Sequence, residues 1–283
     1  MDVVGETAAL VALLRVGNRS PKWYSEALLR SGSARALLDE ELGLLTEMAL
    51  AEAVAEVEAW EQRQIKVVSA FDPRFPMKLR GLAGIPPLLF VAGTPIDADE
   101  RTVAVVGTRQ PTVRGTQMAR KLSRRLTAEG YTVVSGLAAG IDTVAHEAAL
   151  ERQGRTIAVI GSGLDHFYPR QNAGLQRRIS QQGAVVSQFW PESGPTRGSF
   201  PLRNVLMAAL SDACVIVEAS AMSGTRILAR AAVDMRRTVI LVEDLLEQQW
   251  ARELAEHPGV EVARSVAEIT QVLGRAVFPP AHI

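Results

Sequence analysis

The stretch Thr102-Val103-Ala104-Val105-Val106-Gly107-Thr108-Arg109 is an apolar run of strand length that ends in a glycine, a hydroxyl and a cation. Apolar runs of similar length recur along the rest of the chain, at residues 132–136, 156–161, 184–189, 213–219 and 238–242. Stretches with helical periodicity separate them, at residues 115–128, 142–152, 173–182, 204–210 and 225–235. Strands that alternate with helices and are apolar on both faces are typical of a parallel sheet covered by helices. The sequence therefore predicts an α/β fold with a doubly wound, mostly parallel sheet.

The regions around this alternating pattern divide the chain into three predicted parts. Residues 1–64 form a small helical N-terminal domain, because apolar residues recur three or four positions apart. Residues 65–100 contain two short apolar runs and several prolines, and we expect them to connect this domain to the sheet. Residues 101–283 form the sheet domain, with helices predicted at 245–256 and 266–275. The helical domain suits either a packing or dimerisation element or a unit that contacts DNA backbones.

The composition limits the classes of function. The 283-residue chain has 31 basic and 31 acidic side chains and therefore no net charge, so any nucleic-acid binding has to come from a local patch. The single cysteine, Cys214, excludes a disulfide framework and a cysteine-based metal site, and it fits a reducing cytoplasm. No apolar stretch is long enough to cross a membrane, and the start of the chain lacks a signal-peptide pattern. We expect a cytoplasmic protein without membrane contact.

Glycine, hydroxyl and cationic residues gather where the predicted strands end. In an open parallel sheet, ligands bind at this edge, where helix N-termini and exposed amides favour anions. Glycines let a phosphate approach the backbone, and serine, threonine and arginine side chains add donors. An aromatic ring near a cation, as at Tyr168 and Arg170, can stack on a base while the cation holds its phosphate. The predicted phosphate- and DNA-binding residues are Gly107, Thr108, Arg109, Ser135, Gly136, Gly140, Asp142, Gly161, Gly163, Tyr168, Arg170, Asn172, Arg203, Asn204, Ser223, Gly224 and Thr225.

Motifs for catalysis and cofactor binding are missing from this edge. The first strand is not followed by G-x-G-x-x-G, and no P-loop, zinc motif or nucleophile elbow occurs in the sequence. His146 follows Asp142 by one helical turn, and a capping carboxylate with a hydrogen-bonded histidine explains this pair better than catalysis or metal binding. We therefore predict no catalytic residue, no metal and no cofactor, and a binding protein rather than an enzyme.

Three other features allow two interpretations each. The basic face at residues 114–125 is either solvated or in contact with a DNA backbone. Glu218, at the end of a strand, either caps a neighbouring helix or contacts a ligand. Tyr168 either stacks on a base or packs within a loop that Pro169 stiffens.

The ordered run of motifs resembles the DNA-processing protein A family, also called DprA or Smf. The matching residues are Val106 to Arg109, Ser135 to Ala138, Gly140 to Asp142, Gly163 to Asp165, Tyr168-Pro169 with Asn172, and Phe200-Pro201 with Arg203-Asn204. The resemblance implies a Rossmann-like fold and a homodimer that binds single-stranded DNA without sequence preference and helps to load the RecA recombinase in natural transformation. It also implies that Arg109 and Arg170 bind phosphates while Arg203 and Asn204 support the pocket.

The chain departs from the family pattern at several positions. Val205 stands where the family commonly has a second arginine, Gln188 replaces a glutamate, Glu243-Asp244 replaces a Pro-Gly pair, and no obvious C-terminal winged helix follows. These departures favour an alternative, a nucleotide-sensing or nucleotide-cleaving protein of the same superfamily that acts in phage defence or a toxin–antitoxin pair. Cleavage is the weaker form of this alternative. Leu228 occupies the place of the catalytic carboxylate of the similar cytokinin-activating phosphoribohydrolases, and an aliphatic side chain cannot accept a proton.

Overall fold

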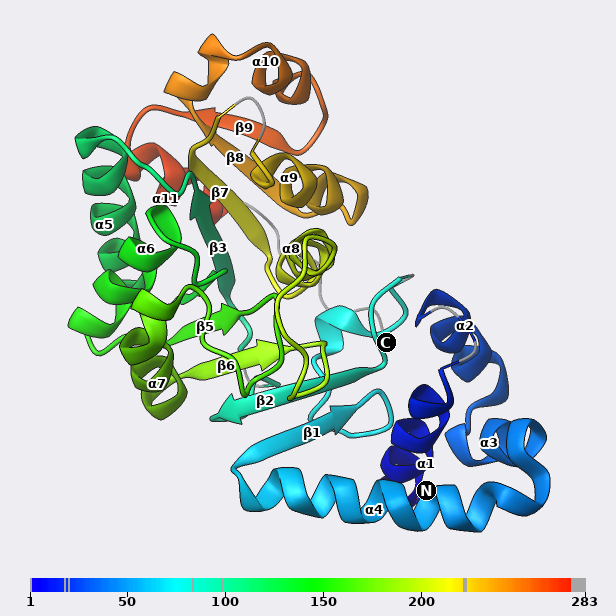
Figure 1. The fold of residues 1–283 in the computed structure, drawn as a ribbon. Helices are drawn as coiled ribbons and strands as arrows, with labels where there is room; N and C mark the ends of the chain where they lie inside the picture. Colours follow the sequence, from blue (N-terminus) through cyan, green and yellow to red (C-terminus); the bar gives the residue numbers. More distant parts are fainter. Residues whose placement is uncertain are drawn as a thin grey trace.

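One sheet runs through the molecule, with its strands in the order β1-β2-β6-β5-β4-β3-β7-β8-β9 (Figure 1). The structure, a computed structural model, describes residues 2–17, 19, 21–82, 84–97, 99–220 and 223–275. The strands are β1 (Ile65–Ser69), β2 (Leu88–Gly93), β3 (Thr102–Gly107), β4 (Thr132–Ser135), β5 (Thr156–Val159), β6 (Ala184–Ser187), β7 (Ala213–Glu218), β8 (Thr238–Val242) and β9 (Val260–Ala263). Strands β3 to β9 pair in parallel, whereas β1 and β2 join the edge of β6 antiparallel. The predicted α/β fold with a Rossmann-like, doubly wound, mostly parallel sheet is confirmed.

The winding of the sheet reverses between β3 and β7. From β3 the chain passes through β4 and β5 to β6, and it then returns to β7 on the other side of β3. The pairing of β3 with β7 shifts register between Val106 and Gly107, where Gly107 comes to lie opposite Glu218. In open α/β sheets the connections diverge at such a reversal and leave a crevice at the carboxyl ends of the strands. The fold therefore places a crevice at Gly107 and Glu218.

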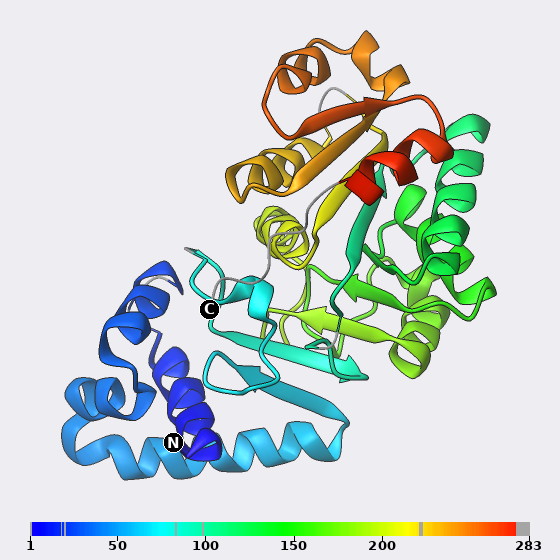
Figure 2. The same cartoon turned by 180° about the vertical axis from the view of Figure 1, so that it is seen from behind.

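Helices cover both faces of the sheet. One face packs against α5 (Val113–Ala128), α6 (Ile141–Glu151), α7 (Ala173–Gln182) and α11 (Val266–Arg275), of which α11 is visible from behind (Figure 2). The other packs against α8 (Ser199–Ala209), α9 (Thr225–Asp234) and α10 (Gln249–Ala255). Neighbouring residues of a strand point to opposite faces, so that Val185 packs with α7 and Val186 with the core beneath α8. Burial on both faces explains the unbroken apolar runs of β3 to β8.

Four helices, α1 (Val3–Val16), α2 (Pro21–Ser31), α3 (Ala34–Leu42) and α4 (Thr46–Gln62), form a lobe beside β1 and β2 (Figures 1 and 2). We call α1 to α4 the helical lobe. Helix α1 is its centre, with residues 7–13 buried, and it is followed by Gly17, whose φ of 65° only glycine adopts at little cost. Trp60 of α4 packs edge-on against Phe90 of β2. The domain boundaries at residues 64 and 100 stay a prediction, although residues 65–69 and 88–93 lie within the sheet.

Two helices differ from the predicted boundaries. The helix predicted from residue 204 starts five residues earlier, at Ser199, and has Pro201 in its first turn, where a proline is tolerated because that N–H has no partner within the helix. The helix predicted over 245–256 is a 3₁₀ segment, Glu243–Glu247, followed by the short α10. Within the described residues no helix has the length and apolar character needed to cross a membrane.

Candidate functional site

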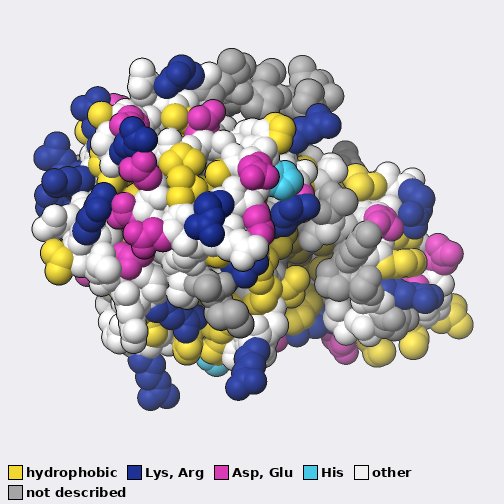
Figure 3. Space-filling model, turned by 90° about the horizontal axis from the view of Figure 1, so that it is seen from above, with side chains coloured by type: hydrophobic (Ala, Val, Ile, Leu, Met, Phe, Trp, Pro, Cys, Tyr) yellow, Lys and Arg dark blue, Asp and Glu magenta, His cyan; other side chains and the backbone are white. Residues whose placement is uncertain are grey.

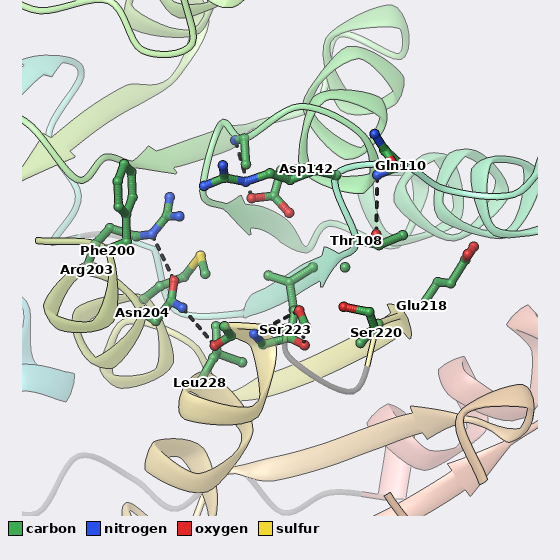
Figure 4. A pocket seen from close by; sticks show the side chains of 18 residues that line it. Thr108, Gln110, Asp142, Phe200, Arg203, Asn204, Glu218, Ser220, Ser223 and Leu228 are labelled. Atoms are coloured by element: carbon green, nitrogen blue, oxygen red, sulfur yellow. Dashed lines mark hydrogen bonds between the residues drawn. The ribbon is translucent and has the colours of Figure 1, made fainter. Parts of the chain in front are cut away.

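A cavity of about 730 Å³ opens at the reversal of the sheet (Figure 4). Its walls come from the loops after β3 and β7, from the start of α6 and from α8 and α9. Phe200 and Arg203 lie on one side of it, and Gln110 and Glu218 lie on the other. The predicted site residues that line it are Gly107, Thr108, Arg109, Asp142, Arg203, Asn204, Ser223, Gly224 and Thr225. We call it the main cavity.

A smaller cavity of about 50 Å³ adjoins the main cavity, with which it shares Arg109, Ala138, Phe200 and Arg203. The predicted residues Gly136, Gly161 and Tyr168 line it, and we call it the side cavity. The rings of Tyr168 and Phe200 are 5.5 Å apart at an angle of 43°. The two cavities thus bring together most of the strand-end residues that the sequence predicts.

Five predicted residues line neither cavity, and two of them are buried in structural hydrogen bonds. The hydroxyl of Ser135 donates to the carbonyl of Val105 over 2.7 Å and so ties β4 to β3. The amide of Asn172 donates to the carbonyl of Leu137 and to the hydroxyl of Thr143, both over 2.8 Å. These side chains shape the loops around the site, and their binding role stays a prediction.

The other three are Gly140, Gly163 and Arg170. Gly140 has a φ of 86°, and a Cβ there would lie 2.3 Å from the carbonyl oxygen of Thr108, so only glycine lets these two turns meet. A Cβ on Gly163 would lie 2.0 Å from the carbonyl oxygen of Trp190. Arg170 is exposed at the start of the 3₁₀ turn Arg170–Asn172. The two glycines act in packing, and Arg170 is open to solvent beside the site loops.

Arg109 is the exposed cation shared by both cavities. Its guanidinium lies 5.6 Å from the ring centre of Phe200, within the range of a cation–π contact. Among the described residues no carboxylate forms an ion pair with it. Its guanidinium is therefore not neutralised by a carboxylate among these residues and can donate to an anionic ligand.

Arg203, in contrast, is 6% exposed, and its Nη1 and Nε donate to groups inside the protein. Its Nη1 donates to the carbonyls of Gly136 and Val159, and its Nε donates to Oδ1 of Asn204 over 2.9 Å. The Nδ2 of Asn204 donates in turn to the carbonyl of Gly224 at the start of α9, over 3.0 Å. Burial lowers the pKa of Arg203, an effect that Asp142 opposes. Arg203 and Asn204 thus join α8 to three other elements and form the floor between the cavities.

Asp142 is a buried carboxylate in the first turn of α6. Burial raises its pKa, whereas the charge of Arg203 and backbone N–H groups such as that of Ala138 act in the opposite direction. His146 is fully buried one turn later and its Nδ1 pairs with the hydroxyl of Thr156 over 2.7 Å. Burial lowers the pKa of His146 to about 3, so the ring is neutral. His146 lines neither cavity, and no group of three or more side chains suited to a metal occurs within the described residues.

The end of β7 and the start of α9 complete the main cavity. Ser223 accepts hydrogen bonds from the N–H and the hydroxyl of Thr225, at 3.2 and 2.9 Å, which orders the first turn of α9. Glu218 accepts from the N–H and the hydroxyl of Thr112, the residue that caps α5. Glu218 therefore holds the start of α5, as the capping interpretation predicts, and because it also lines the cavity its contact with a ligand stays a prediction.

The basic face at residues 114–125 lies on α5 and is largely paired with carboxylates. Arg120 and Arg124 both contact Glu151 of α6, at 2.8 and 2.6 Å. Arg125 pairs with Glu129, and Arg114 pairs with Asp244. In the view from above, Lys and Arg side chains are likewise mixed with Asp and Glu (Figure 3). These pairings favour a solvated face over a DNA contact.

Several lining residues are not among the predicted binding residues: Gln110, Ala138, Phe200, Met207, Ser220 and Leu228. Phe200 stands in the motif Phe200-Pro201, which the resemblance already singled out, so the signal for it was present. Met207 follows Arg203 by one helical turn, and Leu228 follows Gly224 by the same spacing. Helical spacing from the predicted residues thus indicates Met207, and it agrees with the sequence comparison that already singled out Leu228.

Comparison with known proteins identifies the relatives of this chain. The family model of DNA recombination-mediator protein A matches residues 66–275. Protein Smf of Synechocystis sp. is 38% identical over 225 residues, which are 77% of this chain and 56% of the relative. DNA processing protein DprA of Bacillus subtilis is 32% identical over 194 residues, which are 68% of this chain and 65% of the relative. The chain thus spans less than two thirds of the length of these curated relatives.

Two solved structures are similar over most of their length. DNA processing protein A of Streptococcus pneumoniae superimposes with a TM-score of 0.76 at 28% identity, over 94% of this chain and 97% of that one. DNA processing protein A of Helicobacter pylori, known for its single-stranded DNA binding mode, superimposes with a TM-score of 0.66 at 30% identity, over 75% of this chain and 96% of that one. The resemblance inferred from the motifs is confirmed.

Proposed function

Because the chain belongs to the DNA recombination-mediator protein A family, we propose that it binds single-stranded DNA across the main and side cavities. The observation that supports this most is Arg109, an exposed cation without an ion-pair partner among the described residues, placed where the two cavities meet. The Helicobacter pylori relative, whose structure concerns single-stranded DNA binding, adds support.

Two kinds of contact fit a single strand at this site. Arg109 offers a planar fork of donors to a phosphate, and Arg170 offers a second cation on the neighbouring loop. The exposed ring of Tyr168, backed by Phe200, offers a surface on which a base can stack. Neither kind of contact reads base edges, so the binding has no sequence preference. Arg203 and Asn204 support the floor and do not contact the phosphates.

The cellular role is proposed on the family relationship. The protein acts in the cytoplasm as a homodimer and helps to load the RecA recombinase onto single strands during natural transformation. We also propose a binding protein without enzymatic activity. The family relationship favours this, and so does the lack of a catalytic constellation among the described residues of the cavities. Leu228, fully buried at the cavity, cannot act as an acid or a base.

Fluorescence anisotropy of a labelled oligonucleotide at several salt concentrations tests the DNA proposal. Arg109→Ala should lower the affinity about tenfold, because it removes a charge-assisted hydrogen bond to phosphate. It should also reduce the slope of log K against log salt by about 0.7, the value for one phosphate contact on a single strand. Arg125→Ala, which removes an exposed arginine of α5 paired with Glu129, is the matched control and should leave both quantities unchanged. Absence of binding at low salt, or an unchanged affinity of Arg109→Ala, contradicts the proposal.

The size of the main cavity favours one second candidate, a nucleotide sensor. A volume of about 730 Å³ lined by hydroxyl, amide and carboxylate groups can hold a mononucleotide. The sensor is favoured over the DNA binder if nucleoside monophosphates raise the melting temperature of the protein and oligonucleotides do not. A base released during the same incubation and detected by chromatography would establish the nucleotide-cleaving form, which Leu228 disfavours.

A further inference from the structure

Two loops form the Tyr168 side of the proposed DNA site. Residues 160–169 follow β5 and include Tyr168, and residues 188–198 follow β6 and lead directly to Phe200 in the first turn of α8. The two rings face each other at 5.5 Å, and Arg109 lies over the ring of Phe200. The geometry of this side of the site therefore depends on how the two loops are held.

The loops are tied to each other through their backbones. The N–H of Gly163 donates to the carbonyl of Ser193 over 2.7 Å, and the N–H of Asp165 donates to the carbonyl of Pro191 over 3.0 Å. The close approach requires a glycine at position 163, as the distance from its missing Cβ to the carbonyl of Trp190 shows. A displacement of either loop would therefore be passed on to the other.

Arg15, in the last turn of α1, holds the second loop to the helical lobe. Its guanidinium lies 3.9 Å from the ring centre of Trp190 and forms an ion pair with Glu192 at 2.9 Å. The same guanidinium pairs with Glu56 of α4, while Trp190 stacks on Trp60 with ring centres 5.9 Å apart. One cation thus links two helices of the lobe to a loop of the sheet domain.

Arg63, directly after α4, holds the first loop. Its Nη2 donates to a carboxylate oxygen of Asp165. Asp165 is the residue whose N–H bonds the other loop. Arg15 and Arg63 therefore grip the pair of loops at two separate points, and neither arginine lines the main cavity or the side cavity.

We propose that Arg15 and Arg63 are positioning residues for the DNA site, through which the helical lobe holds the loops that present Tyr168 and Phe200. The inference rests on the proposed function, because it assigns the lobe a part in single-strand binding. The lobe packs against β1, the edge strand, which is separated by β2 from β6, the strand from which the second loop leaves. The lobe then serves DNA binding without contacting DNA.

Arg15→Gln, Arg63→Gln and the double variant test the inference in the full chain. Hydrogen–deuterium exchange should rise in residues 160–169 and 188–198, because the contacts that order these loops are lost. Single-strand affinity should fall about threefold to tenfold in the double variant, a typical range for residues that act through others. The slope of log K against log salt should stay at the wild-type value, because neither arginine contacts a phosphate. Arg109→Ala is expected to lower that slope, so the slope separates positioning from direct contact.

Two controls complete the design. Arg35→Gln removes an arginine of the same lobe that pairs with Asp39 and Glu47, and it should leave loop exchange and affinity at wild-type values. Exchanging the charges in the double substitution Arg63→Asp with Asp165→Arg should restore much of the affinity that Arg63→Asp alone loses. Unchanged exchange in both loops overturns the inference, and so does raised exchange with full affinity. If the wild type binds no single-stranded DNA, the proposed function fails, while exchange still decides whether the arginines hold the loops.

Discussion

Replacing Gly136 with alanine should disrupt the floor between the two cavities. A Cβ at this position would lie 2.1 Å from Nη1 of Arg203 and 2.7 Å from Oδ2 of Asp142, far inside contact distance. Neither group can move cheaply. Arg203 is held by the carbonyls of Gly136 and Val159 and by Asn204, and Asp142 is fixed in the first turn of α6.

The loss of stability follows from these contacts. Forcing a methyl group into a filled interior typically costs about 1–3 kcal/mol. Displacing the guanidinium of Arg203 also weakens charge-assisted hydrogen bonds, each worth about 1.5–3 kcal/mol. We expect Gly136→Ala to lower the free energy of unfolding by about 3 kcal/mol, which for a chain of this size is a fall of roughly 6–12 °C in melting temperature. Single-strand affinity should fall as well, because Gly136 lines the side cavity.

Thermal melting and urea unfolding measure this effect, and Gly174→Ala is the matched control. A Cβ on Gly174, in the first turn of α7, would meet no atom within 4 Å. Alanine there should be neutral or stabilise by up to about 0.5 kcal/mol, because it favours the helix. A Gly136→Ala variant that melts within about 2 °C of the wild type, on the same scale of degrees per kcal/mol, would refute this account of the floor.

Three further predictions concern buried groups. Asp142→Asn leaves the charge of buried Arg203 without its opposing carboxylate and should cost about 2–3 kcal/mol in urea unfolding; an unchanged midpoint would contradict it. Because the pKa of His146 falls to about 3 on folding, the unfolded chain takes up a proton below about pH 6.5 that the folded chain refuses, so stability falls as pH drops through this window. The His146 share of that loss between pH 6.5 and pH 5 is about 1.6 kcal/mol, and His146→Gln should flatten the measured pH dependence by this amount. Burial raises the pKa of Cys214 to about 12. A disulfide-exchange reagent at pH 8 should therefore leave this thiol unlabelled in the native protein and label it after denaturation. Rapid labelling of the native protein would show that β7 is accessible to the reagent and would contradict this burial.

Much of the sheet is predictable from the sequence because strands buried on both faces read as unbroken apolar runs. This holds for β3 to β8 and for the site edge at their carboxyl ends. The antiparallel pairing of β2 with β6 is not predictable in the same way. The partners lie about 90 residues apart, and no local sequence pattern indicates which strand pairs with β2. The predicted helix begins only at residue 204, whereas α8 begins at Ser199, because a proline such as Pro201 fits the first turn of a helix.

The site is predictable in its location but less so in the roles of its cations. Arg109 follows the end of β3 and Arg203 lies near the start of α8, yet Arg109 is exposed and Arg203 is bonded to two carbonyls and Asn204. What separates them is Gly136, whose missing side chain leaves room for a guanidinium, and that contact spans 67 residues. The same holds for the basic face of α5. In the sequence it suits a DNA contact, but in the structure Arg120 and Arg124 pair with Glu151, which lies on α6.

Most of the departures from the family pattern lie away from the two cavities. Val205, where a second arginine is common, is half-buried and packs against the core beneath α8, and it lines neither the main nor the side cavity. Gln188 lies beside the helical lobe, and Glu243 is paired with Arg264. Of these positions only Leu228 lines the main cavity, and there it stands in place of a carboxylate and not in place of a cation. The divergence therefore leaves the proposed phosphate contacts in place, and it argues against cleavage of a bound nucleotide more strongly than against binding of a single strand.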